Sequence, residues 1–336
     1  MPKNKRILTG DRPTGQLHLG HYVGSLKNRV MLQEQDEYEQ FILIADIQAL
    51  TDNYDNPQKI KDNILELALG YLSAGINSEK STIVIQSQVP ELAELTIYLM
   101  NMITVAQLER NPTVKNEIRQ KGYRENVPVG FFVYPISQAA DILGFQANLV
   151  PVGEDQLPMI EQSREIARRF NSLYGQTFVE PKEMLSEVSR LCGTDGKEKM
   201  SKSLNNTINL SASADAVVEK VMRMYTDPTR VRATDPGHTE NNPLFIYLNA
   251  FHDDKKEIKD FEDRYRLGKV GDIEVKKRLA EILNGFLEPI RQKRKEYENN
   301  LPLVNSILKQ GTERGRGVVQ KTMSLVRKAV MTDYFG

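Results

Sequence analysis

The chain has 336 residues, of which 40% are hydrophobic and 27% charged, a composition typical of a globular protein with about two domains. Its 45 Lys and Arg residues balance its 45 Asp and Glu residues, which excludes a uniformly basic coat for nucleic acid and leaves only a local basic patch for that purpose. The single cysteine excludes an intramolecular disulfide framework and a cysteine-built metal centre, and four histidines leave little room for a histidine-built one. No stretch approaches the ~18 apolar residues of a membrane span, and we expect a cytoplasmic protein.

Short apolar runs in the first part of the chain predict buried strands. Residues 41–45 form a continuous apolar run, as expected of a parallel strand that is covered on both faces. Three further runs have the length of strands: residues 7–9, 81–86 and 149–152. Two apolar stripes with helical spacing, at residues 60–72 and 92–102, lie between them. The alternation predicts an α/β fold with a Rossmann-like parallel sheet and helices on both of its faces.

The second part of the chain lacks strand signals. Residues 111–127 are polar and aperiodic, which predicts a surface loop. After a loop rich in Gly and Lys at residues 192–206, helical patterns follow at residues 213–225, 255–267, 271–298 and 313–333. We therefore expect a Rossmann-like domain at residues 1–204 and an all-helical C-terminal domain at residues 205–336.

The loop after the first strand, Thr9–Gly24, has the features of a polyphosphate site. Gly10 and Gly15 permit a tight turn close to a ligand. His18 and His21 are three residues apart at the start of a helix, so both lie on one side of its first turn. The helix N-terminus adds free N–H groups and a partial positive charge. Taken alone, two histidines at this spacing favour the simpler interpretation, a Gly-rich turn with two exposed histidines.

A second loop, Asp195–Ser203, carries two lysines among small residues. Lys199 and Lys202 can reach a triphosphate as point charges. Taken alone, this segment favours a solvated basic linker.

Together the two loops resemble the two signatures of the class I aminoacyl-tRNA synthetases. His18–His21 (HLGH) is similar to the HIGH element, and Lys199–Ser203 matches KMSKS in full. The similarity covers nearly the whole chain and is greatest to the bacterial tryptophanyl-tRNA synthetases. It also rests on four further segments: Pro13–Gly15 (PTG), Tyr134–Pro135 (YP), Ala139–Leu143 (AADIL) and Pro151–Gln156 (PVGEDQ).

The resemblance implies ATP-dependent attachment of L-tryptophan to tRNA(Trp) through a tryptophanyl-adenylate, with release of pyrophosphate and AMP. Catalysis would come from alignment and charge stabilisation, without a protein nucleophile. Mg²⁺ would be held mainly by the phosphates of ATP. The resemblance also implies a homodimer, with residues 95–108 expected at part of its interface, and an anticodon-binding role for the helical domain.

The resemblance further assigns the site residues. The catalytic group would be His18, His21, Lys199 and Lys202. ATP would be bound by Arg12, Pro13, Thr14, Gly20, His21, Gly153, Glu154, Asp155, Gln156, Leu191, Lys199, Met200, Ser201, Lys202 and Ser203. Tryptophan would be bound by Leu8, Gln48, Tyr134, Gln138, Asp141, Val150 and Val152.

Specificity for the amino acid is expected on residues 129–141. Pro135 can open a helix there, which places Gln138 and Asp141 one turn apart on the same face. A buried Asp141 carboxylate would accept the indole N–H, and a substrate without that donor would leave the carboxylate unpaired. A surface position is the ordinary one for a lone aspartate, but the small and apolar neighbours of Asp141 favour burial. Family members often carry methionine at the position of Gln138 and histidine at that of Met159, and both differences bear on fine specificity.

Basic residues gather in the last two predicted helices, where they suit either a phosphate backbone or an ordinary solvated helix face. They are Arg291, Lys293, Arg294, Lys295, Arg314, Arg316, Lys321, Arg327 and Lys328. Three other functions stay open from sequence: a tyrosyl-tRNA synthetase, a small-molecule nucleotidyltransferase, and a non-catalytic paralogue that senses tryptophan or binds RNA.

Overall fold

A computed structural model describes residues 5–123, 126–185, 191–196, 200, 204–232 and 234–335 of the chain. Within these residues, five parallel strands form one sheet in the order β3-β2-β1-β4-β5. They are β1 (Lys5–Asp11), β2 (Tyr38–Ile44), β3 (Ser81–Ile85), β4 (Leu149–Val152) and β5 (Lys182–Leu185). The four predicted strands are confirmed. Sequence reasoning missed β5, because its sequence KEML has neither an apolar run nor an alternating pattern.

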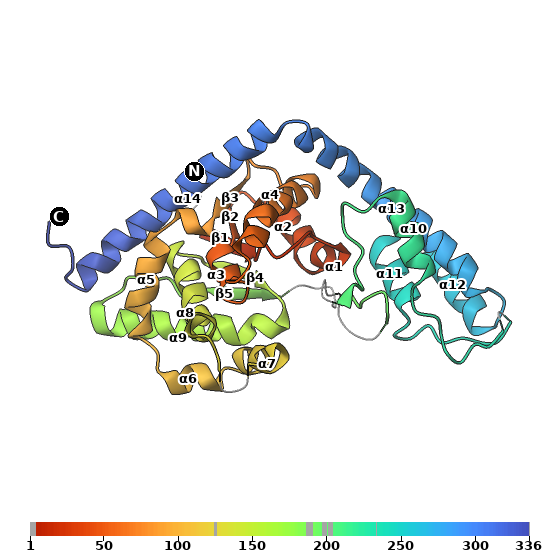
Figure 1. Cartoon of the computed structure of the whole chain (residues 1–336), viewed down its shortest axis with the longest axis horizontal. Coiled ribbons are helices and arrows are strands. Elements are labelled where there is room, and N and C mark those ends of the chain that lie inside the picture. Colours follow the sequence, from red (N-terminus) through yellow and green to blue (C-terminus); the bar gives the residue numbers. More distant parts are fainter. Residues whose placement is uncertain are drawn as a thin grey trace.

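Helices cover both faces of this sheet, as the apolar sequence of β2 predicts (Figure 1). Successive side chains of a strand point to opposite faces. Ile42 and Ile44 accordingly belong to one hydrophobic core, and Phe41 and Leu43 belong to the other. The predicted α/β architecture is therefore confirmed.

The helices of the first half follow the strands in the expected alternation. The helix after β1 consists of α1 (Leu19–His21), a π-helical segment η1 (Tyr22–Leu26) and α2 (Lys27–Leu32). The others are α3 (Asp46–Leu50), α4 (Pro57–Ser73), α5 (Glu91–Met100), α6 (Val105–Arg110), α7 (Pro112–Lys121), α8 (Val129–Gly144) and α9 (Leu157–Tyr174), with short 3₁₀ turns at Gln86–Gln88 and Glu154–Gln156.

The prediction of a loop at residues 111–127 is wrong, because α7 occupies most of it. The Asn111 side chain caps this helix by accepting hydrogen bonds from the N–H groups of Thr113 and Val114. Pro112 fits its first turn, and Gly122, with φ of 69°, ends it. The polar sequence conceals the helix, which its caps and its packing define.

Two further details differ from expectation. Pro135 lies inside α8 rather than at its start. Residues 95–108 form parts of two helices, α5 and α6, and the apolar Leu95, Leu99 and Leu108 are buried in the core of the chain itself.

The second half is helical, with α10 (Ala214–Met222), α11 (Pro243–Phe251), α12 (Lys255–Arg266), α13 (Asp272–Glu298) and α14 (Leu301–Ala329). Figure 1 shows α10, α11 and α12 beside α13, whereas α14 runs back along the sheet. Gly311 allows a close approach to β3, since an added Cβ would lie 2.2 Å from the Ile83 oxygen. Val319 and Met323 of α14 share the core of Phe41. The described part of residues 205–336 is thus helical, and α14 shares a hydrophobic core with the sheet.

None of the helices within the described ranges combines the length and the apolar character that a membrane span requires.

Candidate active site

A cavity of about 440 Å³ opens at the carboxyl ends of β1 and β4. The strand order changes direction here, since β2 and β3 follow on one side of β1 and β4 and β5 on the other. Ligands of parallel sheets bind at such places because the loops diverge there. Twelve of the predicted site residues that the structure describes line the cavity: Leu8, Arg12, Thr14, His21, Gln48, Tyr134, Gln138, Asp141, Val150, Val152, Gly153 and Gln156.

The other predicted site residues do not line this cavity or cannot be placed. Seven described ones lie outside its lining: Pro13, His18, Gly20, Glu154, Asp155, Leu191 and Met200. Lys199, Ser201, Lys202 and Ser203 lie outside the described residues.

The first loop depends on glycine for its path. An added Cβ on Gly10 would lie 2.4 Å from the Leu43 oxygen, and Gly15 has φ of 149°. The rings of His18 and His21 lie against each other, with centroids 3.8 Å apart. The backbone N–H of His18 donates to Nδ1 of His21 at 3.2 Å. His21 lines the cavity whereas His18 is 6% exposed, so the two rings have different surroundings.

The two signature loops meet at Gly20. Its N–H donates to Sδ of Met200 at 3.2 Å. An added Cβ on Gly20 would lie 3.0 Å from the His18 ring and 3.2 Å from the same sulfur. The thioether thus covers the glycine on which the resemblance places the adenosine, and a base seated there would have to displace it.

The helical region holds the start of the lysine loop. Tyr247 Oη donates to the Cys192 oxygen at 2.8 Å, and the Tyr225 N–H donates to the Thr194 oxygen at 2.9 Å. Gly196 has φ of 72°, and an added Cβ would lie 2.9 Å from both Tyr225 and Pro243. Close packing therefore fixes the residues that lead into the KMSKS segment.

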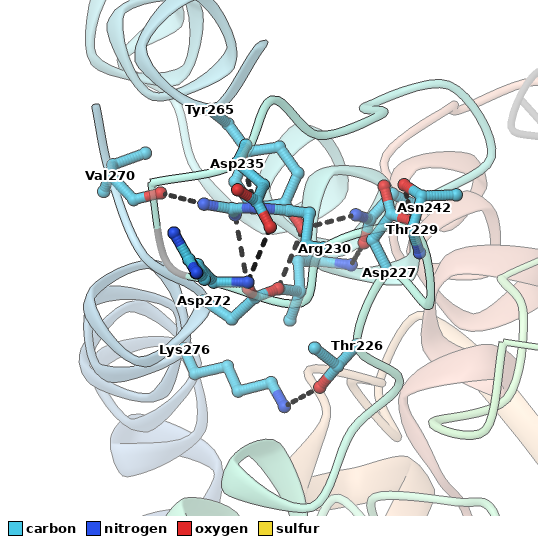
Figure 2. A network of polar contacts seen from close by, with 12 residues as sticks. Thr226, Asp227, Thr229, Arg230, Asp235, Asn242, Tyr265, Val270, Asp272 and Lys276 are labelled. Carbon is cyan, nitrogen blue, oxygen red and sulfur yellow. Dashed lines mark hydrogen bonds and ion pairs between the residues drawn. The ribbon is translucent and has the colours of Figure 1, made fainter. Parts of the chain in front are cut away.

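A buried polar network stabilises the chain between Tyr225 and Pro243 (Figure 2). The Arg230 guanidinium pairs with Asp272 at 3.2 Å, donates to the Val270 oxygen at 2.8 Å, and lies over the Tyr265 ring. Tyr265 Oη donates to Asp272 at 2.8 Å and accepts from Asn242, which caps α11. The network thereby anchors the segment that packs against the lysine loop.

Asp141, on α8, is a buried carboxylate that lines the cavity. It is 4% exposed, and Nε2 of Gln86 donates to its two oxygens at 2.9 and 2.8 Å. Burial raises the pKa of Asp141 to about 7, against the hydrogen bond from Gln86, which lowers it. Ala139 and Ala140 are fully buried beside it. The sequence-based expectation of a buried Asp141 is confirmed.

Helix α7 adds a second carboxylate that sequence reasoning missed. Glu117 lines the cavity and accepts a hydrogen bond of 2.6 Å from Tyr134 Oη. Burial and the nearby Glu117 carboxylate raise the pKa of Tyr134, so the hydroxyl keeps its proton. At the C-terminal end of α7, Lys121 pairs with Asp52 at 2.6 Å, and Arg12 reaches the same carboxylate at 3.7 Å. No sequence signal pointed to Glu117, because the helix that carries it was not predicted.

A third carboxylate, Asp11, is neutralised within the cavity wall. Arg29, 2% exposed, donates to it at 2.6 Å, and Tyr71 Oη donates to the same oxygen at 2.7 Å. Burial would raise the pKa of Asp11, but the Arg29 guanidinium outweighs it and holds the pKa at about 2. This buried pair was also missed, although Asp11 directly follows the apolar core of β1.

The basic residues of the last two helices divide into two groups. The arginines are engaged in ion pairs within the chain: Arg291 with Glu288, Arg294 with Glu66 and Glu298, Arg314 with Glu39, Arg316 with Glu91, and Arg327 with Glu94. The lysines are exposed: Lys293, Lys295, Lys321 and Lys328. The arginines that pair with residues of the sheet region join α13 and α14 to it.

Comparison with known proteins gives a consistent result over the full length of the chain. The family described as tRNA synthetases class I (W and Y) matches residues 2–288. The chain belongs to this family. The tryptophan–tRNA ligases of Clostridium longisporum and of Streptococcus pneumoniae serotype 4 are each 54% identical to it, over 98% of this chain and 97% and 98% of their own lengths.

A solved structure of the class I synthetases superposes closely. The tryptophanyl-tRNA synthetase of Campylobacter jejuni, crystallised with ADP and tryptophan, is 33% identical and matches with a TM-score of 0.85 over 97% of this chain and 99% of that one. The two residues expected to bear on fine specificity have different surroundings. Gln138 lines the cavity, whereas Met159 is buried in a cluster with Phe131 and Tyr134.

Proposed function

We propose that the chain is a tryptophan–tRNA ligase, which joins L-tryptophan to tRNA(Trp) through a tryptophanyl-adenylate. Its full-length similarity to ligases of that name carries the proposal. In the first step, the carboxylate of tryptophan attacks the α-phosphorus of ATP and pyrophosphate leaves. In the second, the terminal ribose hydroxyl of tRNA attacks the acyl carbon and AMP leaves.

The choice of tryptophan rests on Asp141. Indole N–H is a donor only, and an ionised carboxylate is an acceptor only. In an apolar pocket, a charge-assisted bond of this kind is worth more than one in water. A substrate without a donor at that point would leave a buried carboxylate unpaired. Gln48, Gln138, Val150 and Val152 would border the ring, since they line the same cavity.

ATP would occupy the part of the cavity near His21, Arg12 and Thr14. His21 and the lysines Lys199 and Lys202 would stabilise charge on the transferring phosphoryl group and on pyrophosphate. Within the described ranges no three His, Cys, Asp or Glu side chains form a group that could hold a metal. Mg²⁺ would therefore enter with ATP and be held by its phosphate oxygens.

The proposal includes tRNA(Trp) as substrate, a homodimer and action in the cytoplasm. Since the arginines of α13 and α14 are paired within the chain, we assign contact with tRNA phosphates to the exposed lysines Lys293, Lys295, Lys321 and Lys328. For the dimer interface, Ile97 and Val105 are the exposed large apolar residues of the stretch 95–108, at 61% and 63% exposure.

Pyrophosphate exchange into ATP, measured with each of the twenty amino acids, tests the function. We expect exchange with tryptophan alone. Exchange with tyrosine alone would make the chain a tyrosyl-tRNA synthetase. Exchange with no amino acid would favour a nucleotidyltransferase or a non-catalytic paralogue.

A further inference from the structure

Glu117 lines the cavity, and none of the site residues described above forms an ion pair with its carboxylate. Its hydrogen bond comes from the neutral hydroxyl of Tyr134, at 2.6 Å. Among the described residues, no Lys, Arg or His lies within salt-bridge distance of it. Arg12, which also lines the cavity, and Lys121, at the end of α7, are both paired with Asp52.

The other described carboxylates that line the cavity, Asp11 and Asp141, already have partners. Asp11 is neutralised by Arg29. Asp141 accepts from Gln86 and would receive the ring N–H of tryptophan. Among the described residues, Glu117 is therefore the cavity-lining carboxylate that remains for a ligand cation, and a buried or half-buried carboxylate is stabilised when a cation fills that place.

Helix α7 is held at both ends, which fixes the position of Glu117. Near its start, Asn111 donates to Gln162 at 2.9 Å and Thr113 Oγ1 donates to the Asp155 oxygen at 2.8 Å. At its end, Lys121 pairs with Asp52. The Thr113 bond attaches the helix directly to the GEDQ segment. Glu117 thus belongs to a preorganised wall.

Helix α8 sets the distance between the two ends of the amino acid. Tyr134 and Asp141 are seven residues apart, so they leave the same face of α8 about 10 Å apart along its axis. Glu117 lies at the Tyr134 end through its hydrogen bond. A bicyclic amino acid whose ring N–H meets Asp141 therefore directs its α-ammonium group towards Tyr134 and Glu117.

We infer that Glu117 binds the α-ammonium group of the amino-acid substrate, with Tyr134 as its positioning partner. The inference rests on the proposed function and adds a specificity-determining residue to it. Held at its ring and at its ammonium group, the substrate has its carboxylate left to face the phosphates of ATP. The same contact excludes indole acids that lack an amino group, which would otherwise be activated as dead-end adenylates.

Calorimetric titration of the full chain with L-tryptophan and with indole-3-propionate tests the inference. The two ligands share the ring and the carboxylate and differ in the ammonium group. In Glu117→Gln, which keeps an acceptor for Tyr134, we expect tryptophan to bind about 10- to 100-fold more weakly, about 1.4–2.8 kcal/mol. Indole-3-propionate should bind within about twofold of its wild-type affinity, or more tightly, since a nearby negative charge has gone.

The control is Glu109→Gln, which removes the same charge from an exposed position on α6 and should leave both affinities unchanged. Equal losses for the two ligands in Glu117→Gln, or no loss for tryptophan, would overturn the inference. Equal affinities of the wild type for the two ligands would also overturn it. Failure of the proposed function has a different signature: wild type that neither binds tryptophan nor supports exchange.

A second variant distinguishes the loss of the Glu117 contact from a folding defect. Tyr134→Phe removes the hydroxyl that orients Glu117 but leaves the carboxylate in place. We expect a smaller loss for tryptophan than in Glu117→Gln and again little change for indole-3-propionate. A larger loss for tryptophan in Tyr134→Phe than in Glu117→Gln would assign the ammonium contact to the hydroxyl and contradict the role of Glu117.

Discussion

Tryptophan affinity should depend on pH through Asp141. The ionised carboxylate is the form that accepts the indole N–H, and its pKa is raised to about 7. The apparent dissociation constant is the intrinsic one divided by the ionised fraction, about 0.9 at pH 8 and about 0.09 at pH 6. Affinity should therefore fall about tenfold between pH 8 and pH 6. A carboxyl with an ordinary pKa would give no change in this range.

Calorimetry in buffers of matched ionic strength measures this profile. Indole-3-propionate serves as a second ligand, because it keeps the ring N–H and has no amino group to titrate. In Asp141→Asn both ligands should bind weakly and without dependence on pH between 6 and 8. A flat wild-type profile, or a profile that survives in Asp141→Asn, would refute the assignment of Asp141 to the ring.

The same carboxyl should lower the stability of the ligand-free protein at high pH. A carboxyl whose pKa is raised on folding keeps its proton in the folded state between about pH 4 and 7, so stability falls as pH rises through this range. The rise in the pKa of Asp141 from 3.8 to about 7 limits this loss of stability to about 4 kcal/mol above pH 7. Asp141→Asn should therefore raise the urea midpoint more at pH 8 than at pH 5.

Three further predictions follow from other parts of the chain. Lys202→Ala should slow tryptophanyl-adenylate formation in single-turnover assays by about 2–4 kcal/mol of lost charge stabilisation, and an unchanged rate would remove Lys202 from the mechanism. Asp11→Ala should lower the free energy of urea unfolding by about 3–5 kcal/mol, since it leaves the buried Arg29 unpaired. A loss below about 1 kcal/mol would mean that water hydrates the Arg29 guanidinium in the variant. Gly311→Ala should lower the Tm, because its Cβ would lie 2.2 Å from a β3 carbonyl. Gly317→Ala, on the same helix with nothing within 4 Å, should stabilise by about 0.5–1 kcal/mol, and equal effects of the two would contradict the packing of α14 on β3.

Local sequence patterns predicted the centre of the fold. A continuous apolar run specified β2, and glycines with two histidines specified the turn after β1. These features depend on neighbours in the chain, so they can be read from sequence. The burial of Asp141 could also be predicted, because its sequence neighbours are small or apolar.

Features that depend on distant contacts could not be predicted. The α7 helix has a polar sequence, and its position comes from Asn111, Thr113 and Lys121 bonding to segments far along the chain. Glu117 was missed for the same reason. The arginines of α14 had the sequence of a phosphate-binding face, but their partners Glu39, Glu91 and Glu94 are more than 200 residues away.

A crystal structure with a non-hydrolysable tryptophanyl-adenylate analogue and Mg²⁺ would test the central claim most directly. That claim is that one cavity at the ends of β1 and β4 holds the amino acid and the nucleotide together. We predict the indole N–H on Asp141, the ammonium group on Glu117, and the phosphate beside His21. An analogue bound with its ring away from Asp141, or in another cavity, would contradict the account.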